Sequence, residues 1–332
     1  MFDLQNHLDN DSSETESRFS FTATTPHEFT QWQARFRVEL AQVLGIAQRW
    51  PTAVPRPDLL STTDKGSYRE EKYHVHLGDV VIPMYLLIPK RPPPYKTILA
   101  FHGHGMGVHQ ILGNYPDDET AKDMIAHDEN FAQRLAEDGF LVCAIEQRGF
   151  GERITEQISE AGNSCRHLAM HYLMHGKTLI GERIGDAVSV TNYLITRDDI
   201  VPDYLGCTGH SGGGMTALFL GALDTRFNVN VVSGYFCDYQ HSILAMPHCP
   251  CNYVPNLLSL AGIGTLATLI APRRLRFING ENDALFPIAG FHKPISIVQC
   301  AYSLLDVHES LSVVKHTNGH QYLYDAGLEW FQ

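Results

Sequence analysis

Hydrophobic positions near the start of the chain follow a helical period. Residues 25–28 read Thr-Pro-His-Glu, which supplies an N-cap residue, a proline at the first helical position and a capping-box glutamate. Phe29, Trp32, Phe36 and Leu40 follow at intervals of three or four residues. This spacing predicts an amphipathic helix whose apolar stripe packs against the body of the protein.

From residue 73 the pattern becomes typical of strands. Residues 73–89 are β-rich, and Leu77, Gly78 and Asp79 predict a turn between two antiparallel strands. After the prolines at 92–94, strand and helix patterns alternate. We expect strands at residues 97–101, 140–145, 204–208, 229–236, 275–278 and 311–315, and helices at residues 127–138, 178–195, 212–223, 295–305 and 322–331. Near-continuous apolar strands alternating with helices predict an α/β fold, with a mostly parallel central sheet and helices on both faces.

Two long stretches break this alternation and suggest how the chain is organised. Residues 149–176 and 237–272 both follow the carboxyl ends of strands, where such sheets bind ligands. We expect them to form a cap over an active-site pocket. Residues 1–24 are rich in Asp, Ser, Glu and Asn and predict a mobile tail. The expected organisation is a tail and packing helix over residues 1–72 and a catalytic domain over residues 73–332.

Composition and charge exclude several partners. The 332 residues carry a formal net charge of -12, so a nucleic acid or an anionic membrane is not an expected partner. The N-terminus lacks the pattern of a signal peptide, and no run of about 18 apolar residues predicts a membrane span. The seven cysteines are an odd number and several lie in apolar runs. A reduced, cytoplasmic protein is therefore expected.

One short motif carries the predicted chemistry. Residues 209–213 read Gly-His-Ser-Gly-Gly and match the pattern G-x-S-x-G between a predicted strand and a predicted helix. In that context the pattern places a nucleophile, here Ser211, on a strained turn, and the glycines allow close backbone approach. The N–H of Gly212 would then face the oxyanion formed at a carbonyl. The structural alternative is a glycine-rich turn with an incidental serine.

A second glycine-rich turn offers a further oxyanion donor. Residues 102–105 read His-Gly-His-Gly and follow the strand expected at residues 97–101. Where a serine lies on such a turn, the loop after a neighbouring strand supplies a second backbone N–H. We assign this donor to His104. The alternative is a glycine turn with a packed histidine.

The base and the acid are expected further along the chain. A serine at neutral pH needs a base, and the base needs an acid that fixes its tautomer. Asp283 is the favoured acid because it follows a predicted strand, and Glu281 and Asp238 are the alternatives. His320 is the favoured base because it lies in the loop after the last strand, and His316 at the strand end is the alternative.

Taken together, these segments resemble the α/β-hydrolase superfamily. The segments are residues 102–105, residues 147–151 with the sequence Gln-Arg-Gly-Phe-Gly, and residues 209–213, 279–283 and 319–320. Within the superfamily the chain is similar to the dienelactone-hydrolase and acetyl-xylan-esterase-like branch, of which the Tyr-Leu-Leu-Ile-Pro sequence at residues 85–89 is also typical. The resemblance covers residue 73 to the C-terminus and implies a serine esterase. A dienelactone hydrolase would carry a cysteine in place of Ser211, which argues against that particular activity.

Other charged and sulfur-containing groups receive structural interpretations. Arg148 and Glu146 are expected to form an ion pair near the pocket floor, and the alternative is that Arg148 binds an acidic substrate. Glu182 and Arg183 are expected to be a solvated or helix-capping pair. Residues 248–251 read His-Cys-Pro-Cys, but the cysteines are one residue apart and lack a second ligand pair. We therefore expect a packed cap segment and no metal.

The sequence predicts a serine hydrolase that cleaves a carboxylic ester with a small acyl group, carbohydrate acetyl esters included. Ser211, Asp283 and His320 would form the triad, and His104 and Gly212 would hold the oxyanion. No cofactor is expected, the partner is a small-molecule ester, and a homo-oligomer is left open. Two alternatives stay open: a peptidase or amidase with the same triad, and a non-catalytic binding protein on the same fold.

Overall fold

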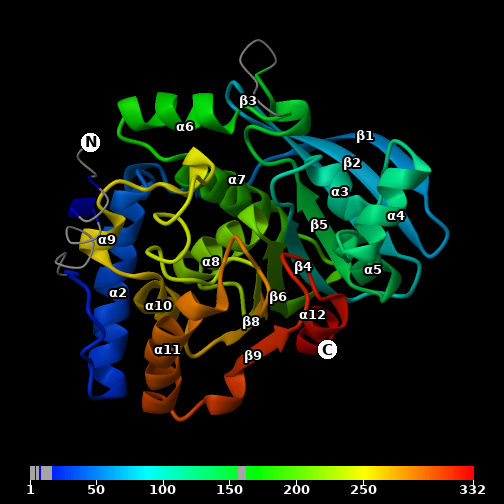
Figure 1. Cartoon of the computed structure of the whole chain (residues 1–332). Coiled ribbons are helices and arrows are strands. Elements are labelled where there is room, and N and C mark those ends of the chain that lie inside the picture. The colour runs from blue at the N-terminus through cyan, green and yellow to red at the C-terminus, as the bar shows by residue number, and fades with distance from the viewer. Residues whose placement is uncertain (1–3, 5–6, 9–16, 156–161) are drawn as a thin grey trace.

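A nine-stranded sheet forms the centre of the computed structural model, which describes residues 4, 7–8, 17–155 and 162–332 (Figure 1). The strands lie in the order β1-β2-β3-β5-β4-β6-β7-β8-β9. Their bounds are β1 (Pro57–Asp64), β2 (Tyr68–Leu77), β3 (Val80–Pro89), β4 (Tyr95–Phe101), β5 (Leu141–Ile145), β6 (Ile200–His210), β7 (Val229–Ser233), β8 (Arg274–Gly280) and β9 (Leu311–His316). The pairings from β5 to β9 are parallel, and those that join β1, β2, β3 and β5 are antiparallel. The predicted α/β fold class is confirmed.

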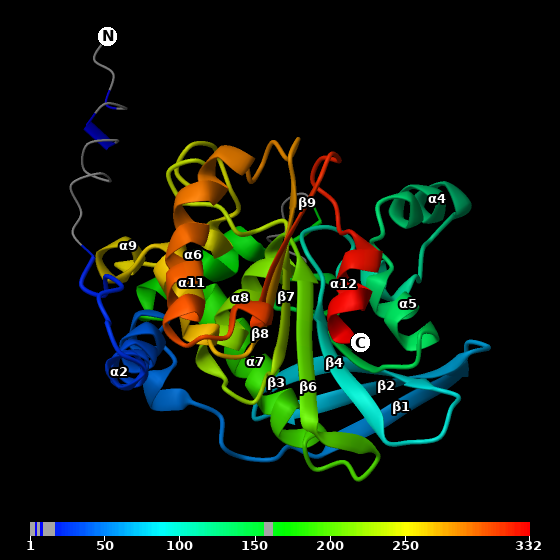
Figure 2. The same ribbon diagram turned by 90° about the horizontal axis from the view of Figure 1, so that it is seen from below.

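Helices cover both faces of this sheet (Figure 2). Their bounds are α2 (Pro26–Val43), α3 (Val108–Leu112), α4 (Asp118–Ala126), α5 (Phe131–Glu137), α6 (Cys165–Met174), α7 (Leu179–Leu194), α8 (Gly212–Leu223), α9 (Leu257–Leu260), α10 (Ile263–Ala267), α11 (His292–Leu304) and α12 (Tyr324–Phe331). Short 3-10 helices are η1 (Ala47–Arg49), η2 (Gly151–Arg153), η4 (Pro250–Asn252), η5 (Thr268–Ile270), η6 (Ile288–Phe291) and η7 (His308–Ser310). Among the described residues, no single helix is long and apolar enough to span a membrane, and one bent helix pair would qualify by length and composition alone.

Alternate residues of the central strands divide the core into two layers. In β4, Leu99 and Phe101 belong to the buried cluster that includes side chains of α2, α7, α8, α10 and α11. Ile98 and Ala100 belong to the cluster on the other face, with α3, α5 and α12. Because successive side chains of a strand point to opposite faces, a continuous apolar strand is buried on both sides. This is the physical basis of the parallel sheet predicted from the apolar runs.

Several elements begin or end where local sequence signals predicted. Thr25 accepts the N–H of Glu28, and both halves of the capping box are present at the start of α2. Leu77 pairs with Val80 across the predicted turn, and Gly78 there has a φ of 61°. Helix α8 has the bounds expected from the sequence.

Two of the elements that the sequence did not predict bury little. The edge strand β1 is exposed along nearly all its length, and α4 has no buried residue, so neither carries the apolar period on which the predictions depended. The helix expected at residues 127–138 begins only at Phe131, since Asp128 has a φ of 56° and ends the preceding helical turn.

The N-terminal segment is only partly a tail. Most of residues 1–16 lie outside the described residues, but the N–H groups of Arg18 and Phe19 donate to the carbonyls of Ser259 and Leu260, at 3.0 and 2.9 Å. Phe19 also stacks on Phe36. The expectation of a tail as far as residue 24 is therefore wrong for residues 17–24, because aromatic side chains in an otherwise polar segment pack on α2.

The two stretches outside the alternation contain α6 and, in the second, η4, α9 and α10. Residues 156–161 of the first stretch lie outside the described part of the chain. The described parts of the two stretches meet, since Cys165 and Ala169 of α6 share a small buried cluster with Cys251. The division into a packing segment and a catalytic domain with a cap stays a prediction.

Candidate active site

Ser211 occupies the turn between β6 and α8, at the carboxyl edge of the sheet. Its φ of 56° and ψ of -120° lie outside the regions that a side chain ordinarily favours. A Cβ on Gly209 would lie 2.3 Å from the carbonyl carbon of Gly213, and one on Gly213 would lie 2.0 Å from the carbonyl oxygen of Phe101. Both positions therefore require glycine, because a side chain would clash with the backbone there. Ser211, between them, is half-buried.

His320 and Asp283 form a hydrogen-bonded pair at the same edge. His320 Nδ1 lies 2.7 Å from Asp283 Oδ2, and the other carboxylate oxygen accepts the N–H groups of Leu285 and Phe286 at 2.8 and 3.0 Å. Burial raises the pKa of Asp283, but the hydrogen bond from His320, its charge and the two amides outweigh burial, so the pKa is lowered overall. The carboxylate is thus held ionised against the imidazole.

The free nitrogen of His320 is available for a proton. Its Nε2 is buried and has no hydrogen-bond partner among the described residues. The imidazole lies against Gly234, where a Cβ would approach His320 Cε1 to 3.2 Å. The neighbouring carbonyl, that of Ser233, accepts the N–H of Ser211 at 3.0 Å. The structure therefore brings Ser211 and His320 to the same backbone segment, although no hydrogen bond joins the serine hydroxyl to Nε2 in the described part of the chain.

The alternative acids and base have other surroundings. Glu281 is exposed. Asp238 accepts the backbone N–H of His241 at 2.9 Å and lies 2.6 Å from the ring nitrogen of the same residue. Neither ring nitrogen of His316 has a hydrogen-bond partner among the described residues. Of the candidates, only Asp283 and His320 are paired with each other.

The loop after β4 lies directly on the serine turn. A Cβ on Gly103 would approach the Cβ of Ser211 to 3.3 Å, and one on Gly212 would approach His104 Nδ1 to 2.9 Å. The loop is held from beneath by buried His102, whose Nε2 lies 3.0 Å from the N–H nitrogen of Gln147. The backbone of Gly103 and the imidazole of His104 therefore meet the N-terminus of α8 beside Ser211. The roles of His104 and Gly212 as oxyanion donors stay predictions.

Arg148 is engaged by carboxylates. Its guanidinium donates to both oxygens of Asp186 at 2.8 Å, to Glu182 at 2.6 Å and to the Tyr172 hydroxyl at 2.8 Å. The expected ion pair between Arg148 and Glu146 is not among the ion pairs of the described residues. A guanidinium that already faces two carboxylates has little capacity for an acidic substrate, so the geometry disfavours that role for Arg148.

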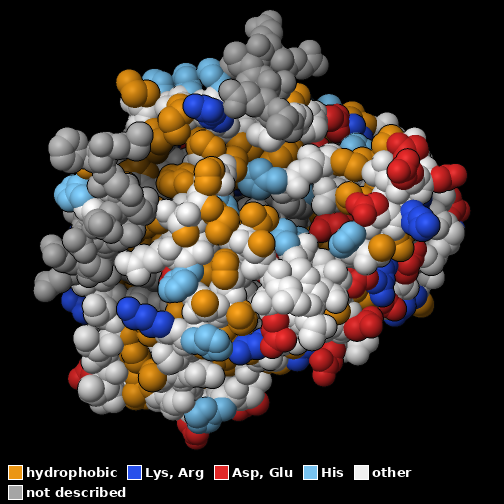
Figure 3. All heavy atoms as spheres, viewed as in Figure 1, with side chains coloured by type: hydrophobic (Ala, Val, Ile, Leu, Met, Phe, Trp, Pro, Cys, Tyr) orange, Lys and Arg blue, Asp and Glu red, His pale blue; other side chains and the backbone are white. Residues whose placement is uncertain are grey.

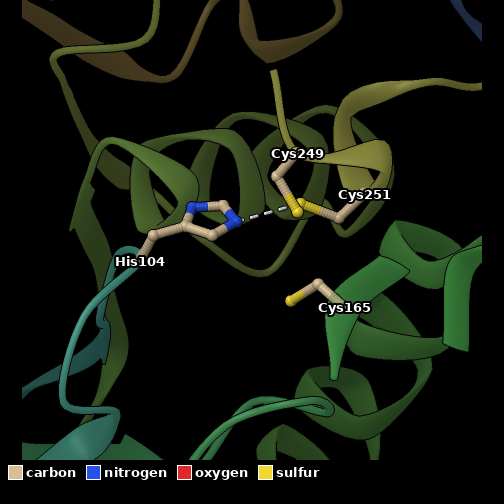
Figure 4. Close-up of side chains that lie close together, drawn as sticks. All are labelled: His104, Cys165, Cys249 and Cys251. Atoms are coloured by element: carbon tan, nitrogen blue, oxygen red, sulfur yellow. Dashed lines mark hydrogen bonds between the residues drawn. The ribbon is translucent and has the colours of Figure 1, made fainter. Parts of the chain in front are cut away.

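Three cysteine sulfurs and one imidazole meet beside this site, and only two of these four residues are neighbours in the sequence. His104, Cys165, Cys249 and Cys251 each offer one ligand atom, and these atoms lie within 4.8 Å of one another (Figure 4). In the sequence, Cys249 and Cys251 stand one residue apart beside His248 and lack a second ligand pair, which is why no metal was expected. The missing ligands come from residues 104 and 165, which are far apart in the chain, so only the fold could reveal the set.

Comparison with known proteins establishes the class. The model of the Abhydrolase family matches residues 8–255, and the chain therefore belongs to this family of α/β-hydrolases.

Individual relatives agree with that assignment. The chain is 29% identical over 254 residues to "Putative hydrolase YtaP" of Bacillus subtilis (strain 168), over 73% of this chain and 79% of that protein. The crystal structure of a "putative acetyl xylan esterase" from Bacteroides fragilis NCTC 9343 is similar with a TM-score of 0.79 at 20% identity, over 95% of this chain and 83% of that one. "Methylesterase BT1017" is similar with a TM-score of 0.74 at 18% identity, over 97% and 68%. At these identities the structural likeness shows the fold.

Proposed function

We propose that this protein is a serine esterase in which Ser211 attacks the carbonyl carbon of a carboxylic ester with a small acyl group. The observation that carries the proposal is the hydrogen-bonded pair of half-buried His320 and buried Asp283 beside the strained serine turn. His320 Nε2 has no hydrogen-bond partner among the described residues. A serine held at such a backbone geometry is the usual form of the nucleophile in this fold.

The proposed reaction begins when Ser211 Oγ bonds to the carbonyl carbon and its proton passes to His320 Nε2. Asp283, held ionised by its hydrogen bonds, stabilises the imidazolium and keeps the ring oriented. The N–H groups of His104 and Gly212 would donate hydrogen bonds to the negatively charged carbonyl oxygen, from the start of a helix in the case of Gly212. The carbon–oxygen bond to the alcohol then breaks, and His320 returns the proton to the departing alkoxide.

Water completes the cycle. His320 removes a proton from a water molecule, which attacks the acyl-enzyme, and the carboxylic acid leaves as Oγ takes the proton back. The names of two structural neighbours, a putative acetyl xylan esterase and a methylesterase, support an ester substrate, and the first name supports a carbohydrate that carries acetyl groups. We infer an ester on a carbohydrate, with acetyl as the acyl group.

Hydrolysis of p-nitrophenyl acetate by the full chain tests the proposal. Wild-type protein should be active and should gain the mass of one fluorophosphonate at Ser211, whereas Ser211→Ala should lose both properties. Removing the oxyanion donors or the nucleophile of a serine hydrolase costs on the order of 100-fold or more in rate. Full activity in Ser211→Ala would refute the assignment.

Chain-length and amide substrates then define specificity. Acetyl esters should be preferred to octanoyl esters, and acetylated xylo-oligosaccharides should release acetate. Faster cleavage of aminoacyl anilides than of esters would instead favour the peptidase or amidase alternative. A folded protein that neither reacts with the fluorophosphonate nor cleaves any ester would favour the binding-protein alternative.

A further inference from the structure

The four side chains beside the serine turn come from three separate parts of the fold. His104 lies in the loop after β4, Cys165 begins α6, and Cys249 and Cys251 flank the proline of η4. Figure 4 shows the imidazole and the sulfurs directed into one space, and His104 Nε2 lies 3.4 Å from Cys251 Sγ. All seven cysteines are free. Two chain segments of the expected cap and one loop of the sheet thus converge on a single point.

The burial of the Arg183 guanidinium beside these sulfurs is a second observation that indicates negative charge at this point. The residue is 2% exposed, and its guanidinium donates to Cys165 Sγ at 3.1 Å and to the carbonyl of Arg148 at 2.8 Å. No carboxylate forms an ion pair with Arg183 in the described part of the chain. An isolated buried cation is strongly unfavourable unless an anion compensates it. Among the described residues, Cys165 is the one side chain that accepts a hydrogen bond from this guanidinium, and the Phe150 ring lies 5.2 Å from its central carbon. The sulfur group is therefore the place for the compensating negative charge.

This arrangement overturns the sequence-based view of Glu182 and Arg183 as a solvated or capping pair. Both are buried, and Glu182 instead forms ion pairs with Arg148 and Arg49. The two residues are neighbours on α7 but have different partners. Glu182 forms ion pairs with arginines, and Arg183 donates a hydrogen bond to a cysteine sulfur.

Three thiolates cannot share one small space without a cation among them. The ligand atoms of the three cysteines and His104 lie within 4.8 Å of one another. Arg183 alone balances one negative charge. The remaining sulfurs either keep their protons or lose them to solvent when a metal ion binds.

We propose that His104, Cys165, Cys249 and Cys251 bind a zinc ion in a tetrahedral Cys₃His site. Zinc carries two positive charges, so with three thiolates and a neutral imidazole the site has a net charge of minus one, which Arg183 offsets. Sulfur and imidazole ligands in this number select zinc over the oxygen-preferring magnesium and calcium. Asn252 Nδ2 lies 3.8 Å from Cys251 Sγ and, with Arg183, provides the N–H groups that typically surround ligand sulfurs.

The site is structural, because four protein ligands leave no coordination position open for water or substrate. Its effect on chemistry is positional. Coordination through Nε2 fixes the proton of His104 on Nδ1, the nitrogen that lies over Gly212. The ion would therefore tie α6 and η4 to the loop that carries one of the proposed oxyanion donors. This last consequence rests on the proposed function, but the zinc site itself does not.

Metal content of the full chain tests the proposal. The protein is produced without a histidine tag, purified with a reductant, incubated with zinc and freed of excess ion. We expect about one zinc per chain by mass spectrometry of the metal. Cys165→Ser and Cys251→Ser should each remove it, whereas the matched control Cys300→Ser, at an exposed cysteine outside the group, should retain it.

A second control tests whether zinc is bound by histidines on the protein surface instead. His167 and His171 of α6 and its C-cap residue His175 are exposed and could hold zinc weakly. Histidine side chains, drawn in pale blue, gather on the surface where α6 lies (Figure 3). Replacing all three by alanine should leave the stoichiometry unchanged. Zinc lost in this variant but kept in Cys251→Ser would overturn the proposal. So would wild-type protein without zinc, or a mass lower by two hydrogens that reveals a disulfide among the three cysteines.

Cobalt substitution keeps the test valid if a cysteine variant fails to fold. Wild-type protein loaded with Co²⁺ should show the visible bands of a tetrahedral ion together with thiolate charge-transfer absorption. Octahedral cobalt without thiolate bands would refute the site. Removal of the ion should lower esterase activity on the order of 10- to 100-fold. A chain that binds zinc but hydrolyses no ester would support the metal site and overturn the proposed function, so the two failures are distinguishable.

Discussion

Replacing Ser211 by glycine should abolish hydrolysis and at the same time make the protein more stable. The serine has a φ of 56° and a ψ of -120°, a combination that only glycine adopts without steric cost. Its hydroxyl forms no hydrogen bond with a protein group in the described part of the chain, so removal of the side chain sacrifices little. Ser211→Ala is the matched control because it removes the hydroxyl but keeps the Cβ that causes the strain.

The magnitude follows from two opposing terms. Relief of an unfavourable backbone geometry stabilises the folded chain by about 1–3 kcal/mol. The greater freedom of glycine in the unfolded chain removes about 0.4–1 kcal/mol of that gain. Ser211→Gly should therefore unfold with a free energy about 0.5–2 kcal/mol higher than that of Ser211→Ala, which corresponds to about 1–3 °C in Tm for a chain of this length.

Urea unfolding followed by tryptophan fluorescence and circular dichroism measures this difference. Equal slopes with a higher midpoint for Ser211→Gly would report greater stability at unchanged exposed surface. A midpoint for Ser211→Gly at or below that of Ser211→Ala would show that the turn is not strained. In that case the backbone argument for Ser211 as the nucleophile would fail.

Three further predictions test the surroundings of the serine. Asp283→Asn should lower kcat on the order of 1,000- to 10,000-fold with little change in KM, since the imidazole loses its orienting carboxylate; a loss below tenfold would place the acid elsewhere. Burial, with smaller contributions from the charges of His320 and His316, holds the pKa of His210 well below 6.5. Below pH 6.5 this histidine is therefore protonated in the unfolded chain but neutral in the folded chain. Stability should fall by about 1 kcal/mol per pH unit below about pH 6.5 on account of this residue, and urea midpoints of His210→Gln should fall less steeply than those of wild type. Arg148→Leu should cost about 3 kcal/mol because it leaves Glu182 and Asp186 without their shared cation, while KM for a neutral ester stays unchanged in the folded fraction; a large rise in KM would restore the substrate-binding role.

The sequence by itself determined the elements whose signals are local. The capping box of α2 and the glycines at 209 and 213 act within a few residues, so spacing alone located the helix and the serine turn. The pairing of Asp283 with His320 was predicted from chain order, and the structure brings the two side chains together. Elements that bury little, such as β1 and α4, gave no apolar period and were missed.

Only the tertiary structure decided which distant side chains meet. Arg148 is two residues from Glu146 in the sequence, yet its carboxylate partners are Asp186 and Glu182 of α7. A buried guanidinium pairs with the carboxylates that the neighbouring helix places beside it. The convergence of His104 and Cys165 on Cys249 and Cys251 depends on the packing of two long insertions, for which the sequence offers no periodic signal. Ligand sets and ion pairs of this kind depend on distances of a few ångströms between remote segments. Hydrophobic patterning does not encode these distances, because it specifies only the face that each element buries.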